Sequence, residues 1–187
     1  MFSRVREATA RRGRNTPAVA AFTVLSTLLG SYSVFATSVR RLELGEIVAA
    51  ADSIVQGRVE AIRCFWRDRQ IYTEVRVAVA RSLKGPRHER LTFLQVGGRV
   101  DSPVPLEMTV PGTPIFRLGE EAYFFLEPGR PGERMVVGLF QGHVPVRHDA
   151  RGDYVGAPGA RKSPAQFDEE IRRHLAGQRP DPSATGP

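Results

Sequence analysis

The chain has 187 residues, of which 41% are hydrophobic and 25% are charged, and this composition is typical of a globular domain with a core of its own. The formal net charge of +7 is carried largely by the first 36 residues, which hold five arginines and one glutamate. The rest of the chain has 22 basic and 19 acidic side chains, a surplus of only three, which argues against a phosphate-binding stripe.

Residues 1–36 have the pattern of an export signal. Basic side chains come first, an apolar run follows at residues 18–29, and the small residue Ala36 lies where a signal peptidase can cut. We therefore expect a signal peptide and an exported domain in the periplasm, the cell envelope or the medium. The alternative is an uncleaved anchor, because residues 17–36 are long enough to cross a bilayer when tilted, and membrane contact is then confined to them.

Cys64 is the only cysteine in the sequence, so the domain cannot form an internal disulfide and its core must be stable without one. It lies in a strand-like run beside Phe65 and Trp66, and we interpret it as a buried structural thiol. A catalytic cysteine needs a histidine close to it in space, and the sequence singles out none.

A short helix and a long hairpin are predicted for the first part of the domain. Apolar residues recur at helical spacing over residues 42–51, which indicates an amphipathic helix. Residues 54–62 have the pattern of a strand, in which Gly57 marks a bend or a close approach of another backbone. Over residues 71–79 every second side chain is apolar, which predicts a half-buried partner strand. The polar residues 67–70 then form the tip of the hairpin.

Further strands are predicted at residues 91–96, 121–126 and 135–140, with a small hairpin over residues 143–156. A proline-rich segment over residues 98–119 separates the first two of these strands. We expect it to be mostly loop, with a short extended piece at residues 106–110. Loops of this length in compact domains are often binding loops or lids.

A second helix is predicted near the end of the chain. Residues 163–166 form a capping-box pattern with proline at the first helical position. The apolar side chains that follow are spaced four apart and can form one docking stripe: Phe167, Ile171 and Leu175. We assign residues 157–177 to a C-terminal helix that packs on the domain. Residues 178–187 are rich in proline and are expected to form a disordered tail.

Short antiparallel strands with glycine kinks, closed at one side by helices, predict a mainly β fold. We expect residues 37–156 to form a small antiparallel OB-like barrel, with a short N-terminal helix and a docked C-terminal helix. A barrel suits an exported domain without disulfides, because closure of the sheet removes its exposed edges.

Four runs of the sequence carry a resemblance to known proteins: ADSIVQGRV (51–59), IYT (71–73), LKG (83–85) and VPGTPIF…LGEEAYFFL (110–126). They are similar to runs in a group of exported bacterial proteins of unassigned function, which have OB-like barrels. The barrel also resembles in outline the netrin-like domain of the tissue metalloprotease inhibitors (TIMPs). Those inhibitors chelate the protease zinc through an N-terminal cysteine. The mature start expected here is Thr37, so the resemblance does not extend to zinc chelation.

Motifs for catalysis or for a cofactor are absent from the sequence. The four histidines lack the HExxH spacing of a zinc site, and a single cysteine cannot form a metal-binding pair. A GxSxG motif and a glycine-rich phosphate loop are absent as well. We therefore expect a non-enzymatic protein without a metal or another cofactor. The alternative is an enzyme whose site is assembled from scattered residues.

Two polar segments form the candidate interaction surface. Its residues are Trp66, Arg67 and Arg69 at the hairpin tip, and Arg99, Asp101 and Glu107 in the long loop. Tryptophan and arginine are the residue types that most often anchor protein interfaces. The alternative for Trp66 is a ring that caps one end of the barrel. Phe116 is expected to anchor the long loop on the core.

We expect an exported interaction module that binds a protein or a cell-envelope component through these segments. One alternative is an extracytoplasmic protease inhibitor that places residues 99–116 in the cleft of a protease. Another is an OB domain that stacks single-stranded nucleic acid on aromatic side chains such as Phe65 and Tyr72. The small charge surplus of the domain and its export both argue against nucleic acid.

Overall fold

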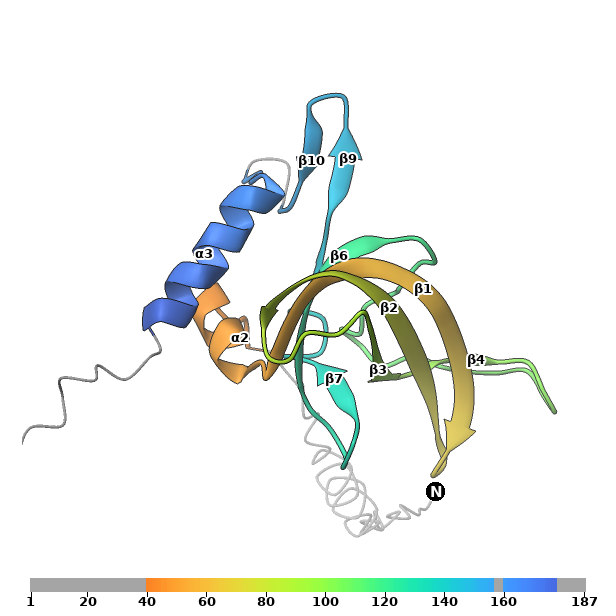
Figure 1. Cartoon of the computed structure of the whole chain (residues 1–187). Coiled ribbons are helices and arrows are strands. Elements are labelled where there is room, and N and C mark those ends of the chain that lie inside the picture. The colour runs from red at the N-terminus through yellow and green to blue at the C-terminus, as the bar shows by residue number, and fades with distance from the viewer. Residues whose placement is uncertain (1–39, 157–159, 178–187) are drawn as a thin grey trace, which may run out of the picture. The chain divides into compact units, whose positions relative to one another are not determined.

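The computed structural model describes residues 40–156 and 160–177, which form a mainly β fold with two helices (Figure 1). The elements are α2 (Leu44–Ala50), β1 (Ser53–Arg67), β2 (Gln70–Lys84), β3 (Arg90–Val96), β4 (Gly98–Val100), β5 (Leu106–Met108), β6 (Glu121–Pro128), β7 (Arg134–Val136), β8 (His143–Pro145), β9 (Arg147–Asp149), β10 (Gly152–Tyr154) and α3 (Pro164–Gly177). The predicted signal segment and the predicted tail lie outside the described residues. No helix within the described ranges is long and apolar enough to cross a membrane.

The long hairpin that the alternating pattern predicts is confirmed. Strands β1 and β2 pair antiparallel from Ile54 opposite Lys84 to Arg67 opposite Gln70. On the inward face of β2, Ile71, Val75 and Val77 are fully buried. The first strand is longer than predicted, because residues 63–67 continue the ladder with β2.

Gly57 lies where the backbones of β1 and β2 approach most closely. A Cβ atom at this position would lie 2.3 Å from the carbonyl oxygen of Ala78 and 2.6 Å from a methyl carbon of Val77. A shift of register between Gln56 and Gly57 accompanies this close approach. The predicted close backbone contact at Gly57 is therefore confirmed.

The remaining strand predictions hold to different degrees. Strands β3 and β6 are confirmed, whereas the predicted strand over residues 135–140 is cut to Arg134–Val136. The chain turns after Val137 because Gly142 donates its N–H to the carbonyl oxygen of Val137, which closes a tight loop. The predicted long loop contains the hairpin formed by β4 and β5, so it is more regular than expected.

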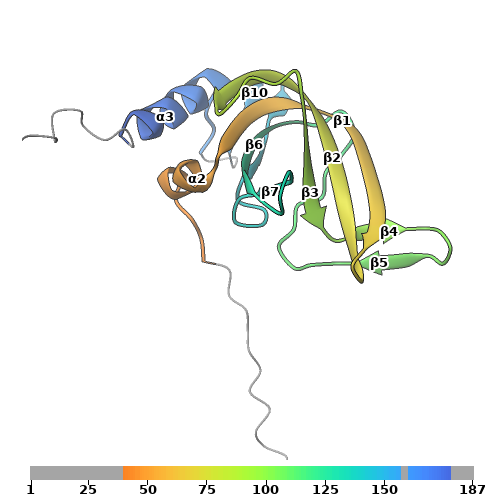
Figure 2. The same cartoon turned by 60° about the horizontal axis from the view of Figure 1, so that its bottom comes forward.

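The main sheet has six strands in the order β3-β2-β1-β6-β7, with β8 also paired to β6, and every pair is antiparallel. The sheet is strongly curved, so that β7 lies close to β3 (Figures 1 and 2). No ladder joins these two edge strands, so the described strands do not form the closed barrel that the sequence led us to expect. Strand β7 has only three residues and offers too few backbone groups to complete the closure.

Both faces of the sheet carry a hydrophobic core. Ile54 and Val55 are consecutive in β1 and are both fully buried, but they belong to different cores. The core of Ile54 includes residues of α2 and α3 and covers one face of the sheet. The core of Val55 lies on the concave face and includes Phe93 and Phe124. Two-sided burial explains why β1 begins with a continuous apolar run rather than with strict alternation.

Helix α3 starts at the predicted capping box and is docked as predicted. Ser163 and Gln166 exchange hydrogen bonds of 2.9 and 3.2 Å between side chain and backbone. Phe167 and Ile171 are buried against the sheet. The docking also uses Asp168, which is only 2% exposed and which the apolar spacing did not indicate.

Candidate binding surface

The tip of the β1–β2 hairpin is a two-residue turn. Asp68 and Arg69 have φ angles of 51° and 64°, which is the left-handed conformation that type I′ hairpin turns require at both positions. Asparagine and glycine are the usual residues in such a turn, and an arginine there is less favourable. The tight turn makes Arg67 and Gln70 a direct pair at the end of the ladder.

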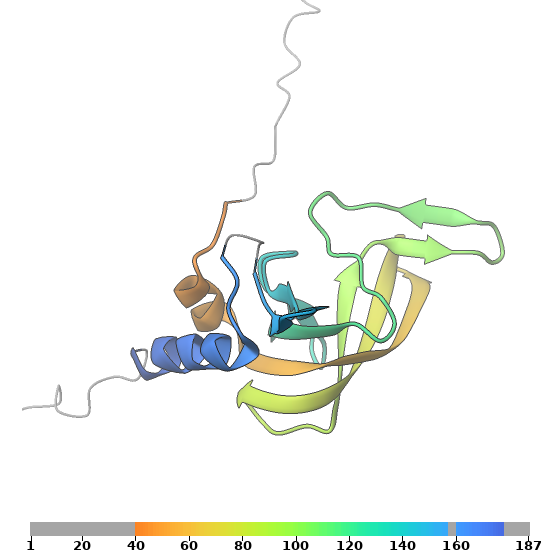
Figure 3. The same ribbon diagram turned by 90° about the horizontal axis from the view of Figure 1, so that it is seen from above.

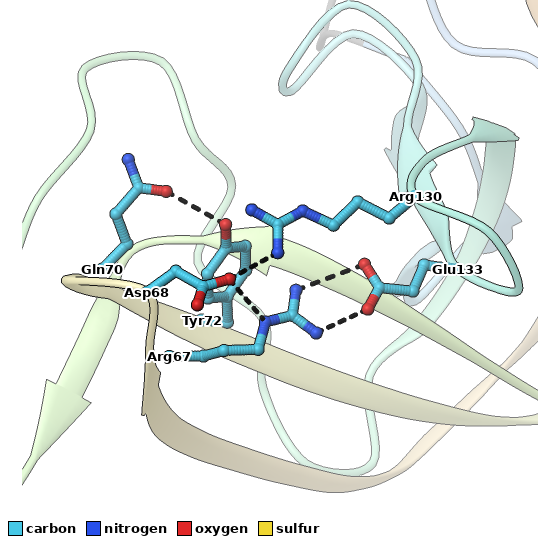
Figure 4. Close-up of polar contacts among 6 residues, drawn as sticks. All are labelled: Arg67, Asp68, Gln70, Tyr72, Arg130 and Glu133. Atoms are coloured by element: carbon cyan, nitrogen blue, oxygen red, sulfur yellow. Dashed lines mark hydrogen bonds and ion pairs between the residues drawn. The ribbon is translucent and has the colours of Figure 1, made fainter.

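The hairpin tip is held by ion pairs to the turn between β6 and β7 (Figure 4). Arg67 donates two hydrogen bonds to the carboxylate of Glu133, at 2.5 and 3.3 Å. Asp68 accepts a hydrogen bond of 2.6 Å from Arg130. The guanidinium carbon of Arg67 also lies 4.5 Å from the centre of the Tyr72 ring. Two elements that are more than 60 residues apart in the sequence are therefore joined at one place.

The ion pairs change the protonation behaviour of both carboxylates. The hydrogen bond from Arg67 holds the pKa of Glu133 below its usual value, and the hydrogen bond from Arg130 does the same for the pKa of Asp68. A lowered carboxylate pKa stabilises the fold above the usual carboxylate range, and that contribution is lost as the pH falls through the lowered pKa. The link between the two turns is therefore maintained at neutral pH and is lost only at acidic pH.

Of the three predicted tip residues, Arg67 differs from the other two. Its side chain is only 30% exposed, because it lies between Tyr72 and Glu133. Trp66 is 53% exposed, so its ring is half open to solvent. Arg69 is exposed, and none of the described residues forms an ion pair with it. Trp66 and Arg69 are thus free to meet a partner, whereas Arg67 mainly supports the tip.

The three predicted loop residues lie together on the β4–β5 hairpin. Arg99 is directly opposite Glu107 in the ladder, and its Nε donates a hydrogen bond of 2.9 Å to Asp101. All three side chains are exposed. The loop is anchored as predicted by Phe116, whose ring lies 5.3 Å from the ring of Phe93 in the concave core.

Both groups of residues lie at the same end of the sheet. Strand β4 contacts β1 and β2 near the tip of their hairpin, and β5 contacts β2 (Figures 2 and 3). Helices α2 and α3 lie at the other end of the sheet in the same views. The surface also includes Val104 and Leu106, which are large exposed apolar side chains that we did not select from the sequence. The sequence does contain a signal for these two exposed residues, because an apolar residue lies on each side of Pro105 in a segment without a strand pattern.

Metal or catalytic chemistry is not indicated at this surface. Among residues 40–156 and 160–177, no three histidine, cysteine or acidic side chains lie close enough together to hold a metal ion. Arg99 forms an exposed ion pair with Asp101 at this surface. The arrangement is suited to contact with another molecule.

The link between the two turns can be tested by substitution. We expect Arg67→Ala and Glu133→Gln each to lower Tm, and the double variant to lose little more than either single variant, because all three remove the same ion pair. The loss should shrink in high salt and below the carboxylate range. Thermal unfolding followed by circular dichroism measures it. Arg63→Ala, which removes a more exposed ion pair to Glu74, serves as the control. Additive losses would show that the ion pair does not hold the tip.

Comparison with known proteins found no matching family, no matching curated protein and no matching solved structure.

Proposed function

We propose that this chain is an exported, non-enzymatic binding module whose contact surface comprises Trp66, Arg69 and the β4–β5 hairpin. The observation that carries the proposal is the gathering of exposed apolar and charged side chains at one end of the sheet. Trp66 is half exposed there, and Val104 is 68% exposed. Large apolar side chains surrounded by polar ones are typical of protein-contact sites on soluble domains.

The partner class that fits this surface best is a protein of the cell envelope. Arg69 and Arg99 are accompanied by the acidic residues Asp101 and Glu107, so the surface has both signs of charge. Mixed charge suits a protein partner, whereas a phosphate backbone is best met by a uniformly basic groove. Export is part of the proposal and rests on the basic and apolar pattern of residues 1–36.

The OB-like character of the fold belongs to the same proposal. An OB fold is a five-stranded, partly open barrel, so incomplete closure is compatible with it. The curved antiparallel sheet and the proximity of β3 to β7 support this assignment.

A second candidate is a protease inhibitor that acts through the β4–β5 hairpin. The specific observation in its favour is that this hairpin projects from the sheet (Figure 3) and presents Val104 between Pro103 and Pro105 near its end. Rigid exposed loops of this kind bind in protease clefts with little loss of conformational entropy. Inhibition of proteases from an envelope fraction by the purified protein would favour this candidate over a purely structural contact.

Capture of partners from an envelope fraction tests the proposed function. A tagged full-length chain is expressed, its location is determined by cell fractionation, and proteins bound to it are identified after nuclease treatment. We expect the chain outside the cytoplasm, and we expect Trp66→Ala to lower recovery of a specific partner about tenfold or more, as for a central interface residue. A chain with residues 101–105 replaced by an Asn-Gly turn should show a similar loss.

Leu118→Ala is the matched control, because Leu118 is an exposed apolar residue that lies outside the proposed surface. It should retain full recovery of the partner. Equal recovery by all variants would remove the proposed surface, and partners lost on nuclease treatment would indicate nucleic acid instead. A chain found only in the cytoplasm would contradict export.

A further inference from the structure

The concave core does not extend to the end of the sheet near the hairpin tip. Phe93 and Val75 form its last fully buried row across β3 and β2. The next row on the same face consists of Gln95, Thr73 and Cys64, which are directly opposite one another on β3, β2 and β1. This row of polar side chains interrupts the apolar face, because Ile71, two residues beyond Thr73 on the same face of β2, is again fully buried.

A cavity of about 370 Å³ lies over this row. We call it the inner cleft. Its floor is formed by Gln95, Thr73 and Cys64, and its other walls are Ile62, residues 96–98 and residues 107–116. The lining is mostly apolar, and Glu107 is its only charged residue. Small-molecule and peptide sites have volumes of this order, mostly apolar walls and a few polar groups that set orientation.

The side chains of two of the three floor residues form hydrogen bonds within the protein, and the side-chain oxygen of the third does not. Thr73 donates to the carbonyl oxygen of Gly97 at 2.6 Å, and the sulfur of Cys64 lies 3.4 Å from the hydroxyl of Thr73. Gln95 is only 3% exposed, and its Oε1 atom has no hydrogen-bond partner among the described residues. A buried carbonyl oxygen without a partner costs free energy, which a ligand can recover by donating an N–H to it.

The close packing of the β3–β4 corner shapes the cleft. A Cβ atom at Gly98 would lie 2.5 Å from the Thr73 hydroxyl oxygen and 2.8 Å from the Cys64 sulfur. Because no side chain can be placed there, the backbone of this corner lies directly against Thr73 and Cys64. Gln95 is the floor side chain whose Oε1 atom has no partner among the described residues.

We propose that the inner cleft binds an uncharged, apolar peptide stretch, and that the amide of Gln95 pairs with one of its peptide groups. A glutamine side chain offers both a donor and an acceptor, and a peptide group offers the complementary pair. An acyl chain has no group that satisfies the amide, and a sugar brings many hydroxyls to a lining that is mostly apolar. An anionic ligand meets no basic residue in the cleft, only Glu107. A volume of this order accommodates about two to three residues.

This site goes beyond the proposed function, because its floor lies on the concave face of the sheet, although its wall shares Gly98, Glu107 and Met108 of the β4–β5 hairpin with the end surface. It can be tested with purified protein, so its failure and the failure of the envelope capture are independent of each other. Cys64 supplies a reporter, since it is the only cysteine, lines the cleft and is half-buried. A ligand in the cleft covers it.

The experiment measures binding of N-acetyl-Leu-Leu-amide to the purified chain by calorimetry, and protection of Cys64 from a methanethiosulfonate reagent locates the site. We expect the peptide to slow the modification of Cys64 by about threefold or more at saturation, as burial of the thiol requires. Gln95→Met, which keeps the volume and removes the amide, should raise Kd about tenfold. Gln56→Met is the matched control, because Gln56 lies on β1 outside the cleft and bonds Arg81.

Two further probes keep the test decisive if Gln95→Met alters the fold. N-acetyl-Leu-Leu with a free carboxylate should bind about tenfold more weakly than the amide, because it meets Glu107 and no cation. An octyl chain without an amide should protect Cys64 much less than the peptide. Equal protection by the octyl chain, or no protection by the peptide, would overturn the proposal. A chain that ends at Gly177 provides the last comparison. If its Cys64 is modified faster than Cys64 of the full-length chain, residues 178–187 occupy the cleft, and the proposal is overturned as well.

Discussion

Replacing Val77 by aspartate is expected to unfold the domain. Val77 is fully buried in the concave core and is directly opposite Val59 on β1 and Leu91 on β3. The side chains of this core are apolar, so a carboxylate at position 77 would lie among groups that cannot pair with it. An unpaired buried charge costs about 3–5 kcal/mol or more, which is comparable with the whole stability of a typical domain. The variant should be unfolded at 25 °C or slightly above, and circular dichroism should show no cooperative thermal transition.

The matched control is Ala80→Asp, which places the same side chain on the same strand at an exposed position. That variant should keep a Tm close to that of the unchanged protein, because a surface charge costs little. A Val77→Asp variant with an unchanged Tm would mean that this face of β2 is not interior. The architecture of the concave core would then be wrong.

Replacing Asp168 by alanine is expected to loosen α3 and to lower the free energy of unfolding by about 2 kcal/mol. Asp168 accepts a hydrogen bond of 2.7 Å from the hydroxyl of Tyr123 and forms an ion pair of 2.6 Å with Arg81. Burial and the bond to Asp168 raise the pKa of Tyr123, so the tyrosine stays a neutral donor at any working pH. The cost stays moderate for two reasons. Arg81 is nearly half exposed, so its guanidinium can form hydrogen bonds with water instead. The hydroxyl of Tyr123 can still donate to the carbonyl oxygen of Pro164.

The measurement is thermal or urea unfolding, with an expected fall in Tm of about 4–8 °C for a chain of this size. Glu169→Ala is the control, because the neighbouring Glu169 forms only an exposed contact with Arg172. Tyr123→Phe should lose part of the same free energy, and its effect should not add to that of Asp168→Ala. Equal Tm values for Asp168→Ala and Glu169→Ala would show that the buried carboxylate does not hold the helix.

The candidate surface was partly predictable from residue type. Tryptophan and arginine in a hairpin tip are a recognisable signal, and Trp66 and Arg69 are indeed exposed there. The role of Arg67 was not predictable, because its partner Glu133 is 66 residues away in the sequence. The position of Gln95 was equally hidden, since a single glutamine in an apolar strand does not reveal whether it has a partner.

The local elements could be derived from the amino-acid sequence: the alternation of β2, the close approach at Gly57 and the capped start of α3. Each of these depends on side-chain period, backbone space or hydrogen bonds within a few residues, so neighbours in the chain specify it. The open sheet and the contact of the hairpin tip with the β6–β7 turn became visible only in the folded chain. Those features depend on strand length, register shifts and curvature summed over the whole sheet, which no short stretch of sequence specifies.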